Sequence, residues 1–222
     1  MENRVLPANF EERLITLARD ASSAILDIYN TDFDVETKID SSPLTLADMA
    51  AHKIIVKGLS ELTPDIPIIS EESVLPEFSE RSKWPTYWLV DPLDGTKEFV
   101  NRNGEFTVNI ALINGNAPHL GVVCVPVQDR TYVGNTSTME ARVYSAAGER
   151  HAKSRRFSEK PNEIKVVASR SHVSDELRAY LASLDESRAK PWVPEQVLVE
   201  LLLCFGDVGW TRELISETAS LL

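Results

Sequence analysis

The spacing of apolar residues predicts two amphipathic helices in the first third of the chain. Between residues 10 and 30, apolar side chains recur every three or four positions, as in a helix that buries one face. Asn9 and Glu12 have the spacing of a capping pair at its start. A second helix is expected over residues 45–62, where Thr45 and Asp48 have the same spacing.

The segments after the helices favour β-strands. Strict alternation of apolar and polar residues predicts a half-exposed strand over residues 33–39. Runs rich in β-branched and aromatic residues predict four more, at residues 66–69, 87–90, 106–113 and 120–127. Asn114-Gly115-Asn116 lies between the last two and is typical of a hairpin turn.

The last third of the chain has weaker patterns. Residues 134–163 are polar and are expected to form loops, followed by a strand at residues 165–168 and a helix capped by Ser174. Helices come first, antiparallel strands follow, and one more αβ unit comes last. This order predicts a layered α/β or α+β sandwich.

The composition is that of a globular protein and narrows the choice of partners. Hydrophobic residues make up 43% of the 222 residues, enough for one large domain or two small ones. The formal net charge is −11. Binding to a nucleic-acid polymer is therefore disfavoured, because it needs clustered Lys and Arg. A small anionic substrate stays open if a metal ion supplies positive charge.

The cysteines and the apolar runs bear on the cellular compartment. The spacing of Cys124 and Cys204 suggests neither a zinc site nor a disulfide framework. The first residues lack the pattern of a signal peptide, and no apolar run approaches the roughly 18 residues that a membrane span needs. We expect a cytoplasmic protein without a transmembrane segment. Attachment to a membrane surface and the oligomeric state stay open.

The densest chemical signal lies at residues 88–96, where an apolar run leads into a turn with two carboxylates. Pro92 fixes the backbone and Gly95 allows a tight bend, so Asp91 and Asp94 can converge. Carboxylates on such a constrained loop suit Mg²⁺. The alternative is a plain structural turn, because Asp-Pro-x-Asp-Gly is common in turns.

A second acidic pair, Glu71-Glu72, follows the apolar run at residues 66–69. Sheets of α/β proteins place their ligands at strand ends, although an exposed surface pair is the alternative here. If carboxylates from both runs are buried together, their mutual repulsion implies a bound cation.

These motifs occur together, and in this order, in one known family. Asp48 in a helix start, Glu71-Glu72 and residues 91–96 resemble the signature of the inositol-monophosphatase superfamily of Mg²⁺-dependent phosphomonoesterases. Further stretches resemble its 3'(2'),5'-bisphosphate nucleotidase branch, namely residues 91–99, 104–112 and 169–172. The resemblance implies an αβαβα layered sandwich.

The resemblance also implies a role for each matching residue. Mg²⁺ would be the cofactor, and its ligands would be Glu71, Asp91, Asp94 and the carbonyl of Leu93. Asp48 and Thr96 would orient and deprotonate the attacking water. Glu72 would support the ligands. The substrate would contact Gly95, Thr96, Ser169 and His172.

Structural alternatives exist for several of these residues. Thr45 and Asp48 would serve only as a helix cap, worth about 1 kcal/mol. Residues 169–172 would be an ordinary strand-to-helix connection. The resemblance puts Lys38 near the phosphate, and an exposed strand lysine is the alternative. The rim of the site is expected to be shaped by Lys97, Glu98 and Arg102.

The activity that the resemblance implies is hydrolysis of adenosine 3',5'-bisphosphate to AMP and phosphate, or removal of the 3'-phosphate from its sulfated analogue, in sulfur assimilation and nucleotide recycling. Three alternatives stay open. One is an inositol- or sugar-phosphate phosphatase of the same superfamily. The second is a remnant that binds metal or nucleotide without turnover. The third is a structural protein whose Asp-Pro-Leu-Asp-Gly run is only a turn.

The resemblance ends near residue 184, so we expect a phosphatase-like domain over residues 1–184 and a divergent tail over residues 185–222. The family carries a later Trp-Asp-x-Ala segment whose Asp binds metal, whereas Trp210 is followed by Thr211. The C-terminal layer of the sandwich would then be incomplete. Our hypothesis is that a shifted reading frame produced the tail. Translating the other two frames tests it, and finding no Trp-Asp segment downstream would contradict it.

Overall fold

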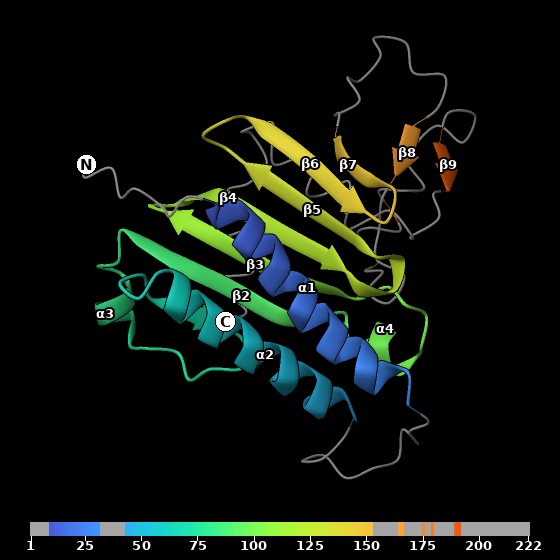
Figure 1. The fold of residues 1–222 in the computed structure, drawn as a ribbon, viewed down its shortest axis with the longest axis horizontal. Helices are drawn as coiled ribbons and strands as arrows, with labels where there is room; N and C mark the ends of the chain where they lie inside the picture. The colour runs from blue at the N-terminus through green and yellow to red at the C-terminus, as the bar shows by residue number, and fades with distance from the viewer. Residues whose placement is uncertain are drawn as a thin grey trace.

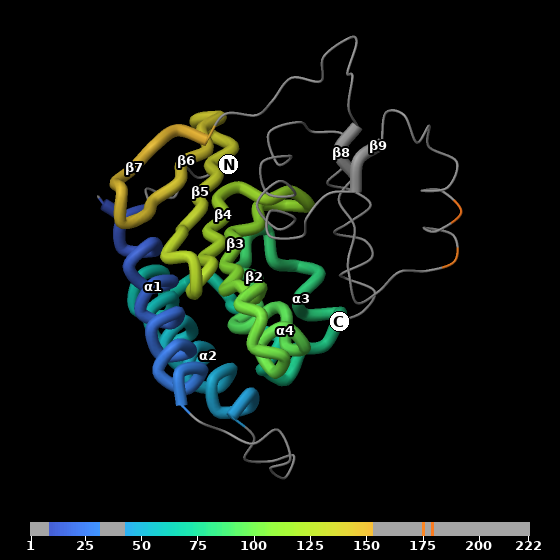
Figure 2. Tube along the Cα trace, turned by 90° about the vertical axis from the view of Figure 1, so that its right-hand side faces the viewer, coloured from blue at the N-terminus to red at the C-terminus, as the bar shows by residue number. Residues whose placement is uncertain are grey.

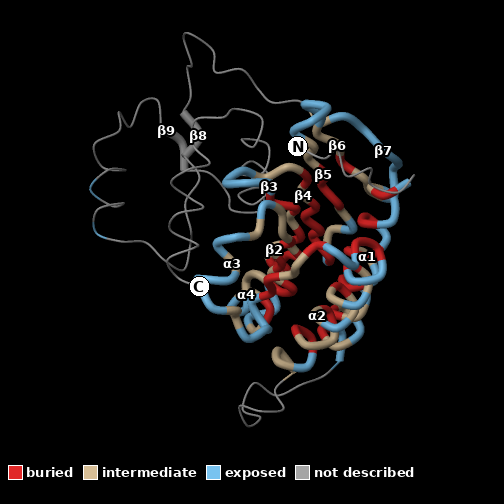
Figure 3. The backbone as a smooth tube through the Cα atoms, turned by 90° about the vertical axis from the view of Figure 1, so that its left-hand side faces the viewer, coloured by how far each residue is buried: buried red, intermediate tan, exposed pale blue. Residues whose placement is uncertain are grey.

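Two helices lie side by side along one face of a seven-stranded sheet (Figures 1 and 2). The structure, a computed structural model, describes residues 9–31, 43–152, 164–166, 175, 179 and 189–191. The helices are α1 (Phe10–Tyr29) and α2 (Pro43–Leu62). Their contacts with the sheet and with each other enclose most of the buried residues (Figure 3).

The strands of the sheet follow one another in sequence order. They are β1 (Ile68–Ser70), β2 (Thr86–Asp94), β3 (Thr107–Asn114), β4 (Ala117–Val125), β5 (Arg130–Asn135), β6 (Glu140–Ser145) and β7 (Gly148–His151). β1 and β2 are parallel, and every later pair is antiparallel. The short helices are α3 (Phe78–Arg81), α4 (Thr96–Val100) and the 3₁₀ turn η2 (Pro126–Gln128). A separate parallel pair consists of β8 (Ile164–Val166) and β9 (Ala189–Pro191).

Both predicted helices are confirmed, but the predicted side-chain cap at the start of α1 is wrong, and α2 begins earlier than expected. Asn9 adopts a left-handed backbone and its side chain makes no capping hydrogen bond. Its carbonyl oxygen instead accepts a hydrogen bond from the Arg13 N–H at 3.0 Å. α2 begins at Pro43, a residue suited to a first helical turn, so Thr45 lies inside the helix rather than before it.

The core is centred on Trp88 of β2, whose side chain is fully buried. Its ring stacks on Phe10 of α1 with 6.0 Å between centroids. Its indole N–H donates to Thr63 Oγ1 at 2.9 Å, just beyond α2. This one side chain therefore joins β2 to α1 and to the residue that follows α2, with its single polar group satisfied.

The sheet confirms the strands expected from apolar runs and extends beyond them. β1 to β4 lie where predicted, and Asn114 to Asn116 form the hairpin turn between β3 and β4. The loop predicted for residues 134–163 is wrong, because β6 and β7 lie within it. All four residues of β7 are exposed, so no apolar periodicity marks that strand.

Several other expectations fall on parts of the chain outside the described residues. These are the strand at residues 33–39, most of the helix after Ser174, and almost all of the tail at residues 185–222. The strand expected at residues 165–168 overlaps β8. The layered α/β class is confirmed by the mixed sheet and its helices. Within the described part, no helix combines the length and the apolar character needed to cross a bilayer.

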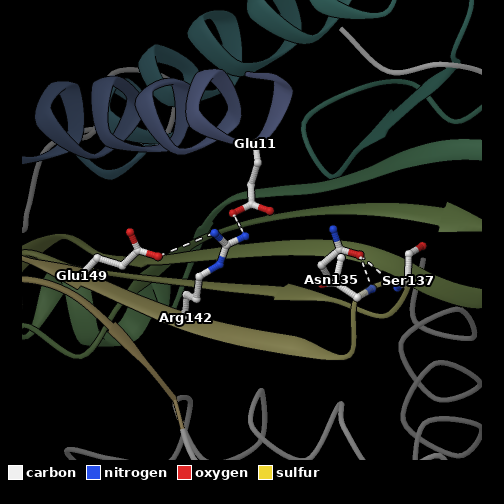
Figure 4. Close-up of polar contacts among 6 residues, drawn as sticks. Glu11, Asn135, Ser137, Arg142 and Glu149 are labelled. Carbon is white, nitrogen blue, oxygen red and sulfur yellow. Dashed lines mark hydrogen bonds and ion pairs between the residues drawn. The ribbon is translucent and has the colours of Figure 1, made fainter. Parts of the chain in front are cut away.

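An ion-pair network ties the first turn of α1 to the distal edge of the sheet (Figure 4). Arg142 of β6 pairs with Glu11 of α1 and, at 3.6 Å, with Glu149 of β7. Partly exposed pairs of this kind contribute at most about 1 kcal/mol each. The network therefore mainly fixes β6 and the edge strand β7 against the helix.

Arg102, which we expected at the rim of the site, binds the C-terminal end of α1. Its guanidinium donates to the carbonyl oxygen of Tyr29 at 3.0 Å and to that of Thr31, just after α1 ends. It also lies over the Tyr29 ring, 5.7 Å from the centroid. The positive charge therefore satisfies carbonyl groups at the C-terminal end of α1.

We expect Arg102→Ala to lower the free energy of unfolding by about 1 kcal/mol, because charged hydrogen bonds to the helix end are lost and partly replaced by water. Urea unfolding measures this. Arg150→Ala, on the exposed strand β7, is the matched control and should change little. Equal losses in both variants would contradict the capping role of Arg102.

Candidate metal centre

Three elements, α2, β1 and β2, place carboxylates beside the C-terminal ends of β1 and β2, which we call the acidic edge of the sheet. β1 and β2 are parallel, so their C-terminal ends meet there. Glu71 and Glu72 directly follow β1, and the Glu71 N–H donates to the carbonyl oxygen of Val90 on β2 at 3.1 Å. Asp48 reaches the same place from α2. One carboxylate oxygen each of Asp48, Glu71 and Glu72 lies within 4.8 Å of the others.

A bulge in β2 brings the second acidic pair to this edge. Asp91 pairs with Asn109 of β3, but Asp94 pairs with Thr107, so β2 carries an extra residue between them. The Leu93 N–H donates to Asp91 Oδ1 at 3.2 Å. Asn109 Nδ2 donates to Asp94 Oδ2, also at 3.2 Å. Asp91 and Asp94 are therefore both fixed by hydrogen bonds at an interruption of the ladder.

Gly95 makes the turn from β2 into α4 possible. Its φ of +92° lies in the region that favours glycine. A Cβ atom there would lie 3.0 Å from the carbonyl oxygen of Glu105. Thr96, the first residue of α4, is exposed immediately after this turn. The turn thus places Asp94 and Thr96 on either side of a backbone position that only glycine suits.

The electrostatics of the site disfavour ionised carboxylates when no cation is bound. Burial, and then the hydrogen bond and charge of Glu72, raise the pKa of Asp48 to about 8. Burial, and then the charges of Asp94 and Glu71, raise the pKa of Asp91 to about 8. Burial also raises the pKa values of Glu71 and Asp94.

These residues fit a hard divalent cation. Asp48 is only 6% exposed, and its Oδ1 has no hydrogen-bond partner among the described residues. Burying a carboxylate oxygen without a hydrogen-bond partner costs free energy, and the neighbouring carboxylates add to this cost. A proton or a bound cation would remove it. An all-oxygen donor set with two exposed glutamates suits an ion that keeps several waters, such as Mg²⁺.

The structure brings together most of the residues expected from the sequence. Asp48, Glu71, Asp91 and Asp94 share one site, with Leu93, Gly95 and Thr96 in the same segment as the two aspartates. Ser169, His172 and Lys38 lie outside the described residues. Their assigned roles stay predictions, as do those of the clustered residues.

Sequence reasoning missed two polar contacts at this edge. Ser70 is fully buried, and its Oγ lies 2.9 Å from Nδ1 of His52, one helical turn after Asp48. This contact ties α2 to the end of β1, where Glu71 begins. Asn109 is the second residue missed. Only the strand register, which the sequence pattern does not give, places it opposite Asp91.

A separate cavity of about 310 Å³ lies against α1. Its lining includes Arg19, Cys124 and Asp129 and none of the clustered carboxylates. The cavity is therefore distinct from the acidic site.

Comparison with known proteins agrees with this geometry. The profile of the Inositol monophosphatase family matches residues 7–192. A 3'(2'),5'-bisphosphate nucleotidase CysQ of Escherichia coli O6:H1 is 48% identical over 178 residues, which are 79% of this chain and 69% of that protein.

Solved structures show the same fold. CysQ from Bacteroides thetaiotaomicron superposes with a TM-score of 0.69 at 35% identity, covering 81% of this chain and 70% of that one. SuhB of Mycobacterium tuberculosis superposes with a TM-score of 0.63 at 20% identity, covering 83% of this chain and 68% of that one. The second likeness concerns the fold alone.

We expect Gly95→Ala to cost about 2–3 kcal/mol of stability and to weaken divalent-metal binding, because the backbone must shift away from Glu105. Gly115→Ala is the matched control. It also has a positive φ, but its Cβ would meet no atom within 4 Å, so about 1 kcal/mol and unchanged metal affinity are expected. Urea unfolding and titration calorimetry measure the two effects, and equal metal affinities in both variants would contradict the expectation.

The raised pKa values predict that the stability of the fold depends on pH, and that bound metal reverses the direction of this dependence. The ordinary pKa of an aspartate is 3.8, and that of Asp48 and Asp91 in the folded state is about 8. At pH values between these two, the folded state holds more protons on Asp48 and Asp91 than the unfolded state does. Without divalent metal, stability contributed by these groups therefore falls as the pH rises through this window. Metal binding requires ionised carboxylates, so it releases protons and its stabilisation grows with pH.

Thermal unfolding at about pH 5 and about pH 8, with and without Mg²⁺, measures this dependence. Calorimetry in two buffers of different ionisation enthalpy counts the protons released. Asp48→Asn removes one titrating group and should reduce both the pH slope and the proton count. Metal binding without proton release near neutral pH would contradict the raised pKa values.

Proposed function

The chain belongs to the inositol monophosphatase family, and from this premise we propose that it is a Mg²⁺-dependent phosphomonoesterase that hydrolyses adenosine 3',5'-bisphosphate to AMP and phosphate. The nucleotidase relatives, 48% identical over most of this chain, support the nucleotide substrate. The observation that carries the proposal is the carboxylate cluster, in which Oδ1 of buried Asp48 has no hydrogen-bond partner within the described part of the chain. The 3'-phosphate of the sulfated analogue presents the same leaving group and is included.

The cation would be held by the residues that the strand ends supply: Glu71, Asp91, Asp94 and the carbonyl of Leu93. When bound, a divalent cation lowers the pKa of a water molecule and neutralises charge on the phosphoryl oxygens. Glu72, beside Asp48 and Glu71, supports the set from its exposed position. Mg²⁺ is favoured over softer metals because the donors are all carboxylate or carbonyl oxygens.

Asp48 and Thr96 act on the attacking water. Burial and the neighbouring Glu72 raise the pKa of Asp48 to about 8 when no cation is bound, so a bound cation would lower this pKa and leave the carboxylate ionised, able to accept a proton. Its carboxylate accepts a proton as the water oxygen bonds to phosphorus. The bond between phosphorus and the 3'-oxygen breaks, and that oxygen takes a proton from solvent water to become the hydroxyl of AMP. Asp48 then returns its proton to solvent. Thr96, exposed at the turn after Asp94, orients the water.

The substrate contacts belong to the same proposal. Gly95 and Thr96 lie beside the carboxylates, where a phosphate bound at the cation would be placed. Ser169 and His172 are assigned to the nucleotide on sequence resemblance. Phosphate release from adenosine bisphosphate, inositol phosphate and fructose bisphosphate distinguishes the nucleotidase from the other phosphatases of the superfamily.

We also propose that the phosphatase-like domain ends near residue 184. A cytoplasmic location of the protein is part of the same proposal. The family profile matches residues 7–192, which supports a unit that ends near this boundary. Among the described residues, the clustered carboxylates come from residues 48–94.

We expect purified chain to release phosphate from adenosine 3',5'-bisphosphate only with Mg²⁺, and Asp94→Asn to reduce this activity by more than about 100-fold. Asp27→Asn, an exposed aspartate of α1, is the matched control and should keep full activity. Mg²⁺ binding without phosphate release by the unsubstituted chain would replace the proposal with a binding remnant. Loss of activity in both variants would show that Asp94 has no special role.

A further inference from the structure

We propose that Asn109 is a positioning residue of the metal centre, which holds Asp94 in the orientation that binds the cation. The proposal rests on the metal-dependent function above. It concerns a residue to which the sequence motifs gave no role, on the strand β3 next to β2.

The contact is specific. Asn109 Nδ2 donates to Asp94 Oδ2 at 3.2 Å, across the bulge between β2 and β3. Oδ2 of Asp94 is thereby held by a neutral side-chain donor, in addition to the backbone hydrogen bond that the Asp94 carboxylate receives from Gly95. Groups that hydrogen-bond to metal ligands set their orientation, and their loss typically weakens metal binding about 10–100-fold.

Asn109 is also out of place in its strand unless it has such a role. Asparagine is unfavourable in strand interiors, yet it lies between Val108 and Ile110, both almost fully buried. Its Oδ1 is buried and has no hydrogen-bond partner among the described residues. A residue that lowers local stability in two ways is expected where it serves a site.

Two substitutions separate positioning from packing. Asn109→Ala removes the donor. Asn109→Leu removes it while keeping a similar shape, and it replaces the unpartnered Oδ1 by an apolar group, so the fold should be kept. Asn114→Ala, at the exposed end of the same strand, is the matched control.

The measurement is the affinity of each metal-free variant for Mg²⁺ alone, by titration calorimetry, together with the thermal midpoint without metal. We expect about 10–100-fold weaker binding in both Asn109 variants, with midpoints close to that of the parent. In the phosphatase assay, a high Mg²⁺ concentration should restore turnover with an unchanged KM for the nucleotide. The Asn114 variant should match the parent throughout.

Mg²⁺ affinity within twofold of the parent in both Asn109 variants would overturn the proposal, and so would two variants that fail to fold, because Asn109 would then be a structural residue. The proposed function fails in a different way. A parent chain that binds Mg²⁺ but releases no phosphate contradicts the nucleotidase activity, while the affinities of the Asn109 variants still decide the role of Asn109.

Discussion

The mutual repulsion of carboxylates is the constraint on which the site depends. Two unit charges 4.8 Å apart at an effective dielectric near 20 repel by about 3.5 kcal/mol, and screening by water reduces this where the groups are exposed. Asp48, Asp91 and Asp94 are partly removed from water as well, which further disfavours their charged forms. The rest of the domain has to hold these groups together against this cost. A divalent cation converts the same arrangement from a destabilising one into a stabilising one.

The fold meets this constraint with rigid elements that join at the strand ends. The Trp88 side chain fixes β2 against α1, and its hydrogen bond to Thr63 fixes the end of α2. The contact between His52 and Ser70 ties α2 to β1. Asp48 therefore cannot move away from the glutamates without disturbing two helix-to-sheet contacts. Sites built on helices and strands in this way keep their geometry better than sites on loops.

The sequence predicted the parts of this structure that are encoded locally. Apolar periodicity located α1, α2 and the first four strands, and the ordered acidic motifs identified the family. The start of α2 was misplaced because Pro43 begins the helix two residues before Thr45. β7 was missed because it is the edge strand and exposes all four residues, and β6 was missed because it buries only Val143. Their pairing is set by the neighbouring strand, which a local pattern does not contain.

The same distinction explains why the acidic residues of the site were found and Asn109 was not. Asp91 and Asp94 are three positions apart, and the turn between them is visible as Pro92 and Gly95. Asn109 reaches Asp94 only because the bulge shifts the register of β3 against β2 by one residue. Without the bulge, a regular ladder starting from the pair Asp91 and Asn109 would place Asp94 opposite Phe106 instead of Thr107, one residue further from Asn109. A residue that supports a ligand from another strand is therefore specified by register, and the register is set by the whole sheet.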